Sequence, residues 1–234
     1  MTEPITTLLL FTFAPSRRLW AFVAMARVTF LLKNVPGLRF HKMMGTGRGR
    51  GFSLRPDWGR YAFLGVWESR AQADAFLADS TFIRRYGRQA ASVTTYLLHA
   101  TGGHGAWDGA NPFIVTADDR HVDNDPPGEI AVLTRATIRA TRLRPFWSMV
   151  APVDRELGEA AGLRWSIGMG EMPWVRQATF SVWEDIASMT AFAYGSEHHR
   201  EVVRRARQER WYAEELFMRF VVVESHRREG GSSS

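Results

Sequence analysis

The chain has 234 residues, of which 45% are hydrophobic and 23% charged, and this composition is typical of a globular protein with a sizeable core. Its formal net charge is +6, yet the basic residues, nearly all Arg, are spread along the sequence, and we therefore expect no nucleic-acid partner. The sequence contains no Cys, which excludes disulfides, Cys-ligated zinc, iron–sulfur clusters and thiol nucleophiles.

The first half of the chain predicts a strand, a helix, two strands, a helix and a strand. Short apolar runs between turn residues indicate the strands, and Ser16 and Ser69 are candidate caps for the helices. The helix at 17–32 holds the most apolar run, but Arg27 interrupts it and the run is too short to span a bilayer. The expected strands are 7–13, 38–44, 61–67 and 92–99, and the second helix is 71–89.

A segment rich in Gly, Asp and Asn follows and predicts a linker at 104–128. The second half repeats the order of elements and ends in a tail at 227–234 that we expect to be disordered. Its expected strands are 129–139, 163–169, 176–183 and 217–224, and its helices are 143–161 and 186–215, the latter broken near Gly195 and Trp211.

Several motifs occur twice at one separation. Val66-Trp67-Glu68 and Val182-Trp183-Glu184 are 116 positions apart, and so are Ala75-Phe76 and Ala191-Phe192. A repeat of this kind indicates a duplicated unit, and the order βαββαβ is ferredoxin-like.

The sequence therefore predicts an α+β chain of two fused ferredoxin-like (βαββαβ) repeats that form a dimeric-α+β-barrel-type fold within one chain. The predicted repeats are 1–103 and 129–226, and the second is expected to carry the functional site.

The second repeat departs from the first where it acquires His198-His199 in place of two apolar residues. On a helical period His199 shares a stripe with Phe192 and Val203, so it is expected among apolar side chains facing the sheet. Neutral imidazole is a common ligand of haem iron. A core His bonded to a backbone carbonyl explains the same pattern, and His198 competes with His199.

A second candidate is the segment Ser166-Ile167-Gly168-Met169-Gly170-Glu171. Two glycines in a strand indicate a bulge or a close approach of backbone to a ligand, although a plain hairpin exit explains them equally well. Glu171 is a candidate proton donor. Gln177, on an otherwise buried strand face, is a candidate for orienting a bound polar group.

These stretches carry a family resemblance that spans about residues 7–222. They resemble the spheroidene monooxygenases, the acyclic carotenoid ketolases of purple phototrophs. That family is similar to the dimeric α+β barrel superfamily, which includes haem-dependent aldoxime dehydratases and small monooxygenases. The motifs that carry the resemblance are Ser166–Glu171, Gln177–Trp183, Phe192–Tyr194, Trp211–Phe220, Arg18–Phe22 and Pro36–Leu38.

The resemblance implies a haem-dependent monooxygenase that contains haem b and oxidises an apolar small molecule with O2, using electrons from a ferredoxin-like donor. It implies that His199, which follows the Phe-Ala-Tyr segment, ligates the iron, with His198 as the alternative register. The catalytic candidates are Glu171 and Gln177. The other residues expected around the haem are Phe192, Trp147, Ser166, Met169, Phe180 and Val203.

Two other functions stay open at this point. One is a haem-dependent lyase of the aldoxime dehydratase kind, which needs no external electrons, and the other is a non-catalytic haem-binding or association module. Because the N-terminus lacks the pattern of a secretory signal, we expect a cytoplasmic protein. A peripheral membrane contact and a homodimer both remain open.

Overall fold

The computed structural model describes residues 4–49, 51–113, 115 and 128–230. The chain divides into two compact units, both of mixed α/β architecture. The first unit comprises Met1–Thr46, Asp57–His99 and Val223–Ser234, and the second comprises Gly47–Pro56 and Ala100–Val222. No helix among the described residues is long and apolar enough to cross a membrane.

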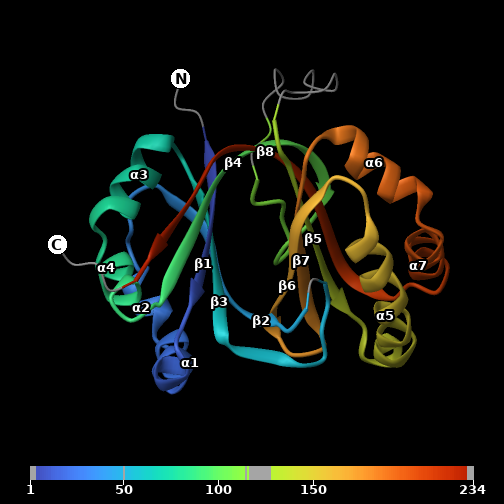
Figure 1. Cartoon of the computed structure of the whole chain (residues 1–234), viewed down its shortest axis with the longest axis horizontal. Coiled ribbons are helices and arrows are strands. Elements are labelled where there is room, and N and C mark those ends of the chain that lie inside the picture. Colours follow the sequence, from blue (N-terminus) through green and yellow to red (C-terminus); the bar gives the residue numbers. More distant parts are fainter. Residues whose placement is uncertain (1–3, 50, 114, 116–127, 231–234) are drawn as a thin grey trace. The chain divides into compact units, whose positions relative to one another are not determined.

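The first unit is built on the strand order β4-β1-β3-β2, in which β1 pairs antiparallel with β3 and with β4. Its helices lie along this sheet (Figure 1). The strands are β1 (Ile5–Thr12), β2 (Leu38–Gly47), β3 (Pro56–Trp67) and β4 (Ser92–Gly105). The helices are α1 (Arg18–Met25), α2 (Val28–Leu31), α3 (Arg70–Asp79) and α4 (Thr81–Gly87), and a 3-10 turn at Pro15–Arg17 precedes α1.

Aromatic side chains fill the core of the first unit, between its sheet and its helices. Phe82 and Tyr86 of α4 are fully buried and stack with their ring centroids 4.5 Å apart. Phe63 of β3 lies 4.9 Å from Phe82 on the same measure, and Ile83 is buried beside them. Aromatic contacts of this kind add to the stabilisation from area burial, and they fill the space between α4 and the sheet.

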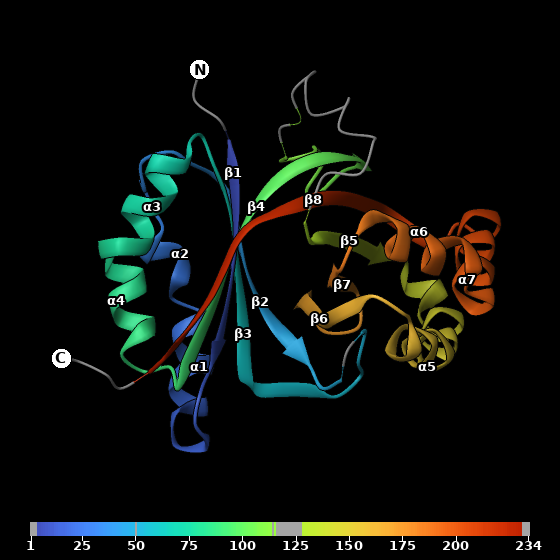
Figure 2. The same cartoon turned by 45° about the horizontal axis from the view of Figure 1, so that its top comes forward.

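The second unit has the strand order β8-β5-β7-β6, with β5 antiparallel to β7 and β8, and β7 antiparallel to β6. Figure 2 shows α5, α6 and α7 beside these strands. The strands are β5 (Ile130–Ile138), β6 (Leu163–Met172), β7 (Arg176–Trp183) and β8 (Tyr212–Glu229). The helices are α5 (Leu143–Glu159), α6 (Ile186–Gly195) and α7 (Glu197–Gln208), and a 3-10 turn at Ala140–Arg142 precedes α5.

The predicted helices 71–89 and 186–215 are each interrupted by a serine that caps a new helix. The Ser80 hydroxyl accepts a hydrogen bond from the Ile83 N–H (3.1 Å) and starts α4, and the Ser196 hydroxyl does the same for His199 (3.1 Å) and starts α7. Both serines have extended backbones, as N-cap residues do. Their separation, 196 − 80 = 116, equals that of the repeated motifs.

The predicted helix 186–215 is wrong at its end, because α7 stops at Gln208 and β8 begins at Tyr212. Arg210 has a φ of 52°, a left-handed conformation that ends a helix. The predicted helix 17–32 is also two helices, α1 and α2.

The predicted linker and tail are partly ordered. β4 continues to Gly105, and Trp107, with a side chain only 2% exposed, forms a bridge to Ala110. The rest of the linker, at 114 and 116–127, lies outside the described residues, as do 231–234 of the tail, whereas β8 runs to Glu229. The repeat boundaries at 103 and 226 stay predictions.

Candidate functional site

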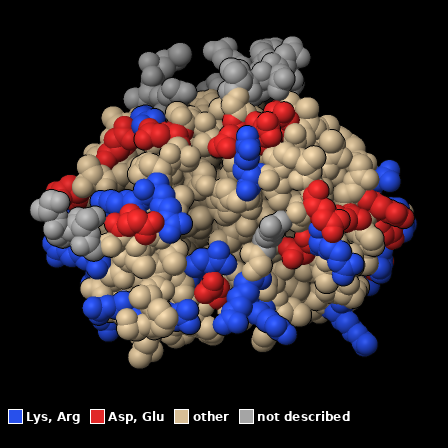
Figure 3. Space-filling model, in the orientation of Figure 1, with Lys and Arg blue, Asp and Glu red and all other residues tan. Residues whose placement is uncertain are grey.

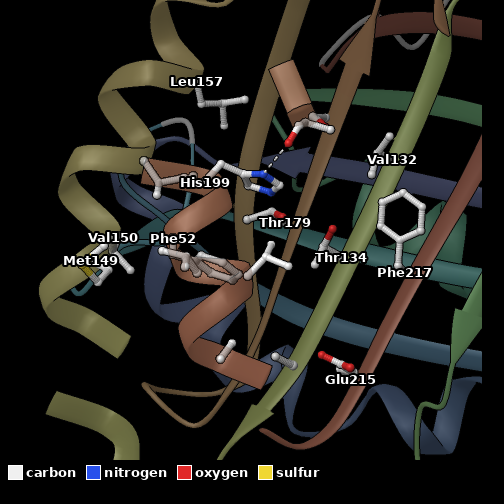
Figure 4. Close-up of a pocket in the computed structure, with 18 of the residues that line it drawn as sticks. Phe52, Val132, Thr134, Met149, Val150, Leu157, Thr179, His199, Glu215 and Phe217 are labelled. Atoms are coloured by element: carbon white, nitrogen blue, oxygen red, sulfur yellow. Dashed lines mark hydrogen bonds between the residues drawn. The ribbon is translucent and has the colours of Figure 1, made fainter. Parts of the chain in front are cut away.

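The second unit contains a pocket of about 310 Å³ between its sheet and its helices. Figure 4 shows its two walls, one from α5 and α7 and the other from the strands. Most lining side chains are apolar, among them Leu157 of α5, Val132 of β5 and Phe217 of β8. A concave, mainly apolar pocket with few polar groups is where a small molecule or cofactor binds.

His199 lies in this pocket, on the first turn of α7. Its ring Nδ1 is 3.2 Å from the carbonyl oxygen of Ala193, and a carbonyl only accepts, so Nδ1 carries the proton. The lone pair is therefore on Nε2. Burial lowers the pKa of His199, while the bond to Ala193 and the charge of Glu156 act in the opposite direction. The ring is consequently neutral at neutral pH, as a metal ligand must be.

His198 belongs to a different environment. Its Nδ1 contacts the carboxylate of Glu156, which also accepts a hydrogen bond from the Ser196 hydroxyl. The bonds from His198 and then Ser196 lower the pKa of Glu156. The His198 side chain is 48% exposed and does not line the pocket. The geometry thus separates the two His residues, which the sequence left as alternatives.

The strand wall places two hydroxyl groups in otherwise apolar surroundings. Thr134 of β5 and Thr179 of β7 are direct partners in the strand register, and both line the pocket (Figure 4). Ser181 also lines it, but its hydroxyl accepts a hydrogen bond from the Trp183 indole (2.9 Å). Direct cross-strand partners lie on the same sheet face, so the two threonines form a pair.

Polar groups also stand along β8 and at the end of β4. Glu215 and Tyr212 of β8 line the pocket, and burial followed by the charge of Glu215 raises the pKa of Tyr212. His104, a second His in the lining, is exposed and stacks on Phe217 with ring centroids 5.7 Å apart. Arg207 of α7 contributes a cation.

The structure brings Phe192 and Val203 to the pocket with His199, as their shared stripe predicts, and the Phe192 ring centroid is 5.4 Å from that of His199. The other predicted site residues do not line it. Side chains alternate along a strand, so Phe180, next to Thr179, lies on the opposite face. The predicted residues outside the lining are Trp147, Ser166, Met169, Glu171, Gln177 and Phe180.

Two of these residues are tied to the backbone. The Gln177 side chain donates a hydrogen bond to the Met172 carbonyl (3.0 Å), and the Trp147 indole donates to the Trp174 carbonyl (3.2 Å). The glycines that drew attention to this region have a local reason as well. A Cβ on Gly168 would lie 1.9 Å from the carbonyl oxygen of Gly51, so the closely approaching backbone belongs to the chain itself.

Glu171 takes part in a buried ion cluster, which we call the Arg135 cluster and which consists of Arg135, Glu171, Glu214 and Trp107. The Arg135 side chain is 1% exposed and lies 3.5 Å from Glu171, and its other terminal nitrogen contacts Glu214. The Trp107 indole donates to Glu171 (2.8 Å) and its ring faces the guanidinium. The cluster lies on the sheet face opposite the pocket, because Arg135 follows Thr134 on β5.

Glu214 is held in its charged form within the Arg135 cluster. Burial raises its pKa, but the backbone N–H groups of Gly109 and Asp108 and the Arg135 charge outweigh burial and lower it. The Gly109 N–H donates at 2.7 Å and the Asp108 N–H at 3.2 Å. The carboxylates of Glu171 and Glu214 therefore balance the charge of the buried Arg135 guanidinium. A guanidinium removed from water needs such partners.

Sequence reasoning missed Thr134, Thr179 and Glu215. A signal was present, because Thr134 alternates with Ala136 and Thr179 with Ser181, which puts small polar residues on strand faces that a packed core would fill with large apolar ones.

Comparisons with known proteins place the chain in a family and give its fold neighbours. A family model described as "Domain of unknown function (DUF3291)" matches residues 120–223. Spheroidene monooxygenase of Rhodobacter capsulatus is 34% identical over 218 residues, covering 93% of this chain and 89% of the relative. Spheroidene monooxygenase of Rubrivivax gelatinosus is 36% identical over 217 residues, covering 93% of this chain and 81% of the relative.

A solved structure is similar over nearly the whole chain. The crystal structure of an aldoxime dehydratase (OxdRE) in complex with butyraldoxime matches with a TM-score of 0.64 at 12% identity, covering 97% of this chain and 83% of that one. At this identity the likeness shows the fold alone. The two curated relatives, by contrast, are identical to this chain at 34% and 36% of the aligned positions, across most of their own length. The chain therefore belongs to the spheroidene monooxygenase family and is a monooxygenase, an enzyme that acts on a small molecule with O2.

Proposed function

We propose that this monooxygenase is haem-dependent and that His199 ligates the iron of a haem b bound in the pocket of the second unit. The observation that carries the proposal is the neutral His199 imidazole, which lines the pocket and has Nδ1 bound to the Ala193 carbonyl. A hydrogen bond at one ring nitrogen fixes the orientation of a ligating His and raises the basicity of the other.

The donor set fits a haem. Among the described residues, no three His, Cys, Asp or Glu side chains gather as a metal site, so an iron at His199 would take its remaining ligands largely from a porphyrin. Phe192, Leu157 and Val203 would contact the flat apolar macrocycle. Arg207 would pair with a propionate, since a guanidinium binds carboxylates well. When bound, the haem would supply the activation of O2.

Thr134 and Thr179 are the residues we assign to hydrogen bonding on the strand wall. Each hydroxyl can donate a hydrogen bond to an oxygen atom held in the pocket, and most of the lining around them is apolar. Glu171 and Gln177 do not line the pocket, so we give them no part at this wall.

Thr134→Val with Thr179→Val is expected to lower turnover by about tenfold to a hundredfold, because it removes both hydrogen-bond donors of the pair from the mainly apolar strand wall. Haem content and the absorption spectrum should stay those of the wild type, since His199 is untouched. Steady-state oxygenation rates check this, with Thr137→Val, on the same strand but outside the pocket lining, as the control. Unchanged turnover in the double variant would show that the pair takes no part.

The proposed substrate is apolar, in keeping with the pocket walls and with the names of the spheroidene monooxygenases. The electrons would come from a ferredoxin-like donor. A cytoplasmic location and a homodimer stay predictions.

For the fold, we propose that the two units are duplicated ferredoxin-like repeats of the dimeric α+β barrel class. Their strand orders, β4-β1-β3-β2 and β8-β5-β7-β6, correspond one to one. The caps also correspond, since Ser69 and Asp185 start α3 and α6, and Ser80 and Ser196 start α4 and α7. In this alignment Ile83 of the packed first core matches His199.

The test is to purify the full chain with haem supplied, record the visible spectrum and then assay oxygenation of spheroidene with isotopically labelled O2 and a ferredoxin reducing system. A Soret band and labelled product are expected. A protein that never acquires a Soret band would overturn the proposal. The aldoxime dehydratase fold motivates one further arm, because turnover of an aldoxime without reductase would favour a haem-dependent lyase.

A further inference from the structure

The helices α1 and α2 of the first unit, together with Trp58 of β3, expose large apolar side chains that we call the α1–α2 surface, made of Leu19, Phe22, Val23, Phe30 and Trp58. Leu19 is 76% exposed and Phe30 is 81% exposed. Leu19, Phe22 and Val23 follow the i, i+3, i+4 spacing of one helix face. The Phe22 and Trp58 rings are in edge contact at 5.4 Å. A contiguous exposed apolar patch marks an interaction site.

A shallow groove of about 580 Å³ extends this surface. Phe22 and Val23 of α1 form one side of it, and His41, Lys42 and Met43 of β2 form the other. The apolar face of α1 thus borders the groove, and the cationic side chain of Lys42 lies on the opposite side of the groove.

The charge of the segment that carries α1 and α2 is positive, and Asp57, next to Trp58, is an acidic residue at its end that pairs with Arg60 (2.8 Å). From Pro4 to Pro56 the sequence contains no Asp or Glu. Arg17, Arg27 and Lys33 are exposed, and none of the three has an ion-pair partner among the described residues. Figure 3 shows Lys and Arg side chains on both sides of uncharged surface over α1. The nine basic residues of this stretch are Arg17, Arg18, Arg27, Lys33, Arg39, Lys42, Arg48, Arg50 and Arg55.

We propose that the α1–α2 surface docks onto the surface of an anionic lipid bilayer. Leu19, Phe22 and Phe30 would enter the boundary between headgroups and acyl chains, while the flanking cations would meet lipid phosphates. A second copy of the chain is a poorer occupant, because it would bring two predominantly basic surfaces together, with Arg17, Arg27 and Lys33 exposed on each. The contact lies on the surface and needs no spanning helix. If the proposed apolar substrate is dissolved in the bilayer, docking would bring the enzyme to its substrate. Only this consequence rests on the proposed function.

The proposal is tested by co-sedimentation of the full-length protein with vesicles. Binding is expected to vesicles of equal parts phosphatidylglycerol and phosphatidylcholine, to weaken with added salt, and to be far weaker with phosphatidylcholine alone. Leu19→Ser with Phe30→Ser should weaken binding by at least about tenfold. Arg27→Gln and Lys33→Gln should each weaken it by about fivefold. Tyr194→Ser is the matched control, since Tyr194 is 75% exposed but lies on α6 of the second unit.

Three results would overturn the proposal: no binding to the anionic vesicles, equal binding by Leu19→Ser with Phe30→Ser and by the wild type, or an equal loss in Tyr194→Ser. A dimer in solution that Phe30→Ser dissociates would assign the surface to a second copy and would also reject bilayer docking. The visible spectrum of each variant is recorded in parallel. A protein that fails to bind vesicles but keeps its Soret band would therefore contradict bilayer docking and leave the haem proposal intact. A protein that binds vesicles but has no Soret band would contradict the haem proposal and leave bilayer docking intact.

Discussion

His199→Ala is expected to abolish the Soret band and to reduce oxygenation to background, whereas His198→Ala keeps both. The reason is the position of the two rings: the neutral His199 imidazole lies in the pocket, and the His198 ring contacts Glu156 outside it. Without the His199 imidazole the pocket would offer the iron no nitrogen ligand from α7, and the apolar contacts alone would hold the haem weakly. Visible absorption and haem content per chain, measured on purified variants, check the result.

His104 provides the matched control, since it is the other His that lines the pocket but is exposed and stacked on Phe217. His104→Ala should keep the Soret band. A second readout uses added imidazole, which should enter the space left by His199→Ala and restore the band without the side chain. If His199→Ala retains a wild-type spectrum, or if His198→Ala or His104→Ala loses it, the assignment of the ligand is wrong.

The sequence located each predicted strand because each contains a short apolar run, but β3, β4 and β8 extend beyond the predicted ranges. It was less accurate for the helices, since Ser80 looks like an ordinary polar residue within a longer helical pattern, whereas the predicted break near Gly195, next to Ser196, is confirmed. In the structure each serine caps a new helix with its hydroxyl. The positive φ of Arg210, which ends the last helix, has no signature in its residue type.

The site could be predicted in part because a repeat supplies its own reference. His199 stood out since the matching residue of the first repeat, Ile83, is apolar. The threonine pair could not be found in this way, because the pairing of Thr134 with Thr179 depends on the register of β5 and β7. The partner of Glu171 was equally hidden, since Trp107 is 64 positions away and comes from the predicted linker.

Arg135→Met is expected to lower the free energy of unfolding by about 3–5 kcal/mol, because removing one partner of a buried ion pair leaves the other charge uncompensated. In this protein the substitution would leave the Glu214 carboxylate without its buried cation. The pKa of Glu214 is held low by the backbone N–H groups and by Arg135, and Glu171 would lose the same cation. Urea unfolding of the wild type and the variant measures the difference. Arg139→Met is the control, since Arg139 follows the same strand but is exposed, and it should change stability by less than about 1 kcal/mol.

The cause of the loss is separable from the loss of packing around the Arg135 side chain. If the uncompensated carboxylates are responsible, adding Glu171→Gln and Glu214→Gln to Arg135→Met should restore much of the lost stability, because a neutral amide carries no buried charge. In the wild-type background the same two substitutions should destabilise the protein by leaving Arg135 unpaired. An Arg135→Met variant as stable as the wild type, or a triple variant no more stable than Arg135→Met, would show that the Arg135 cluster does not act as a charge-balanced unit.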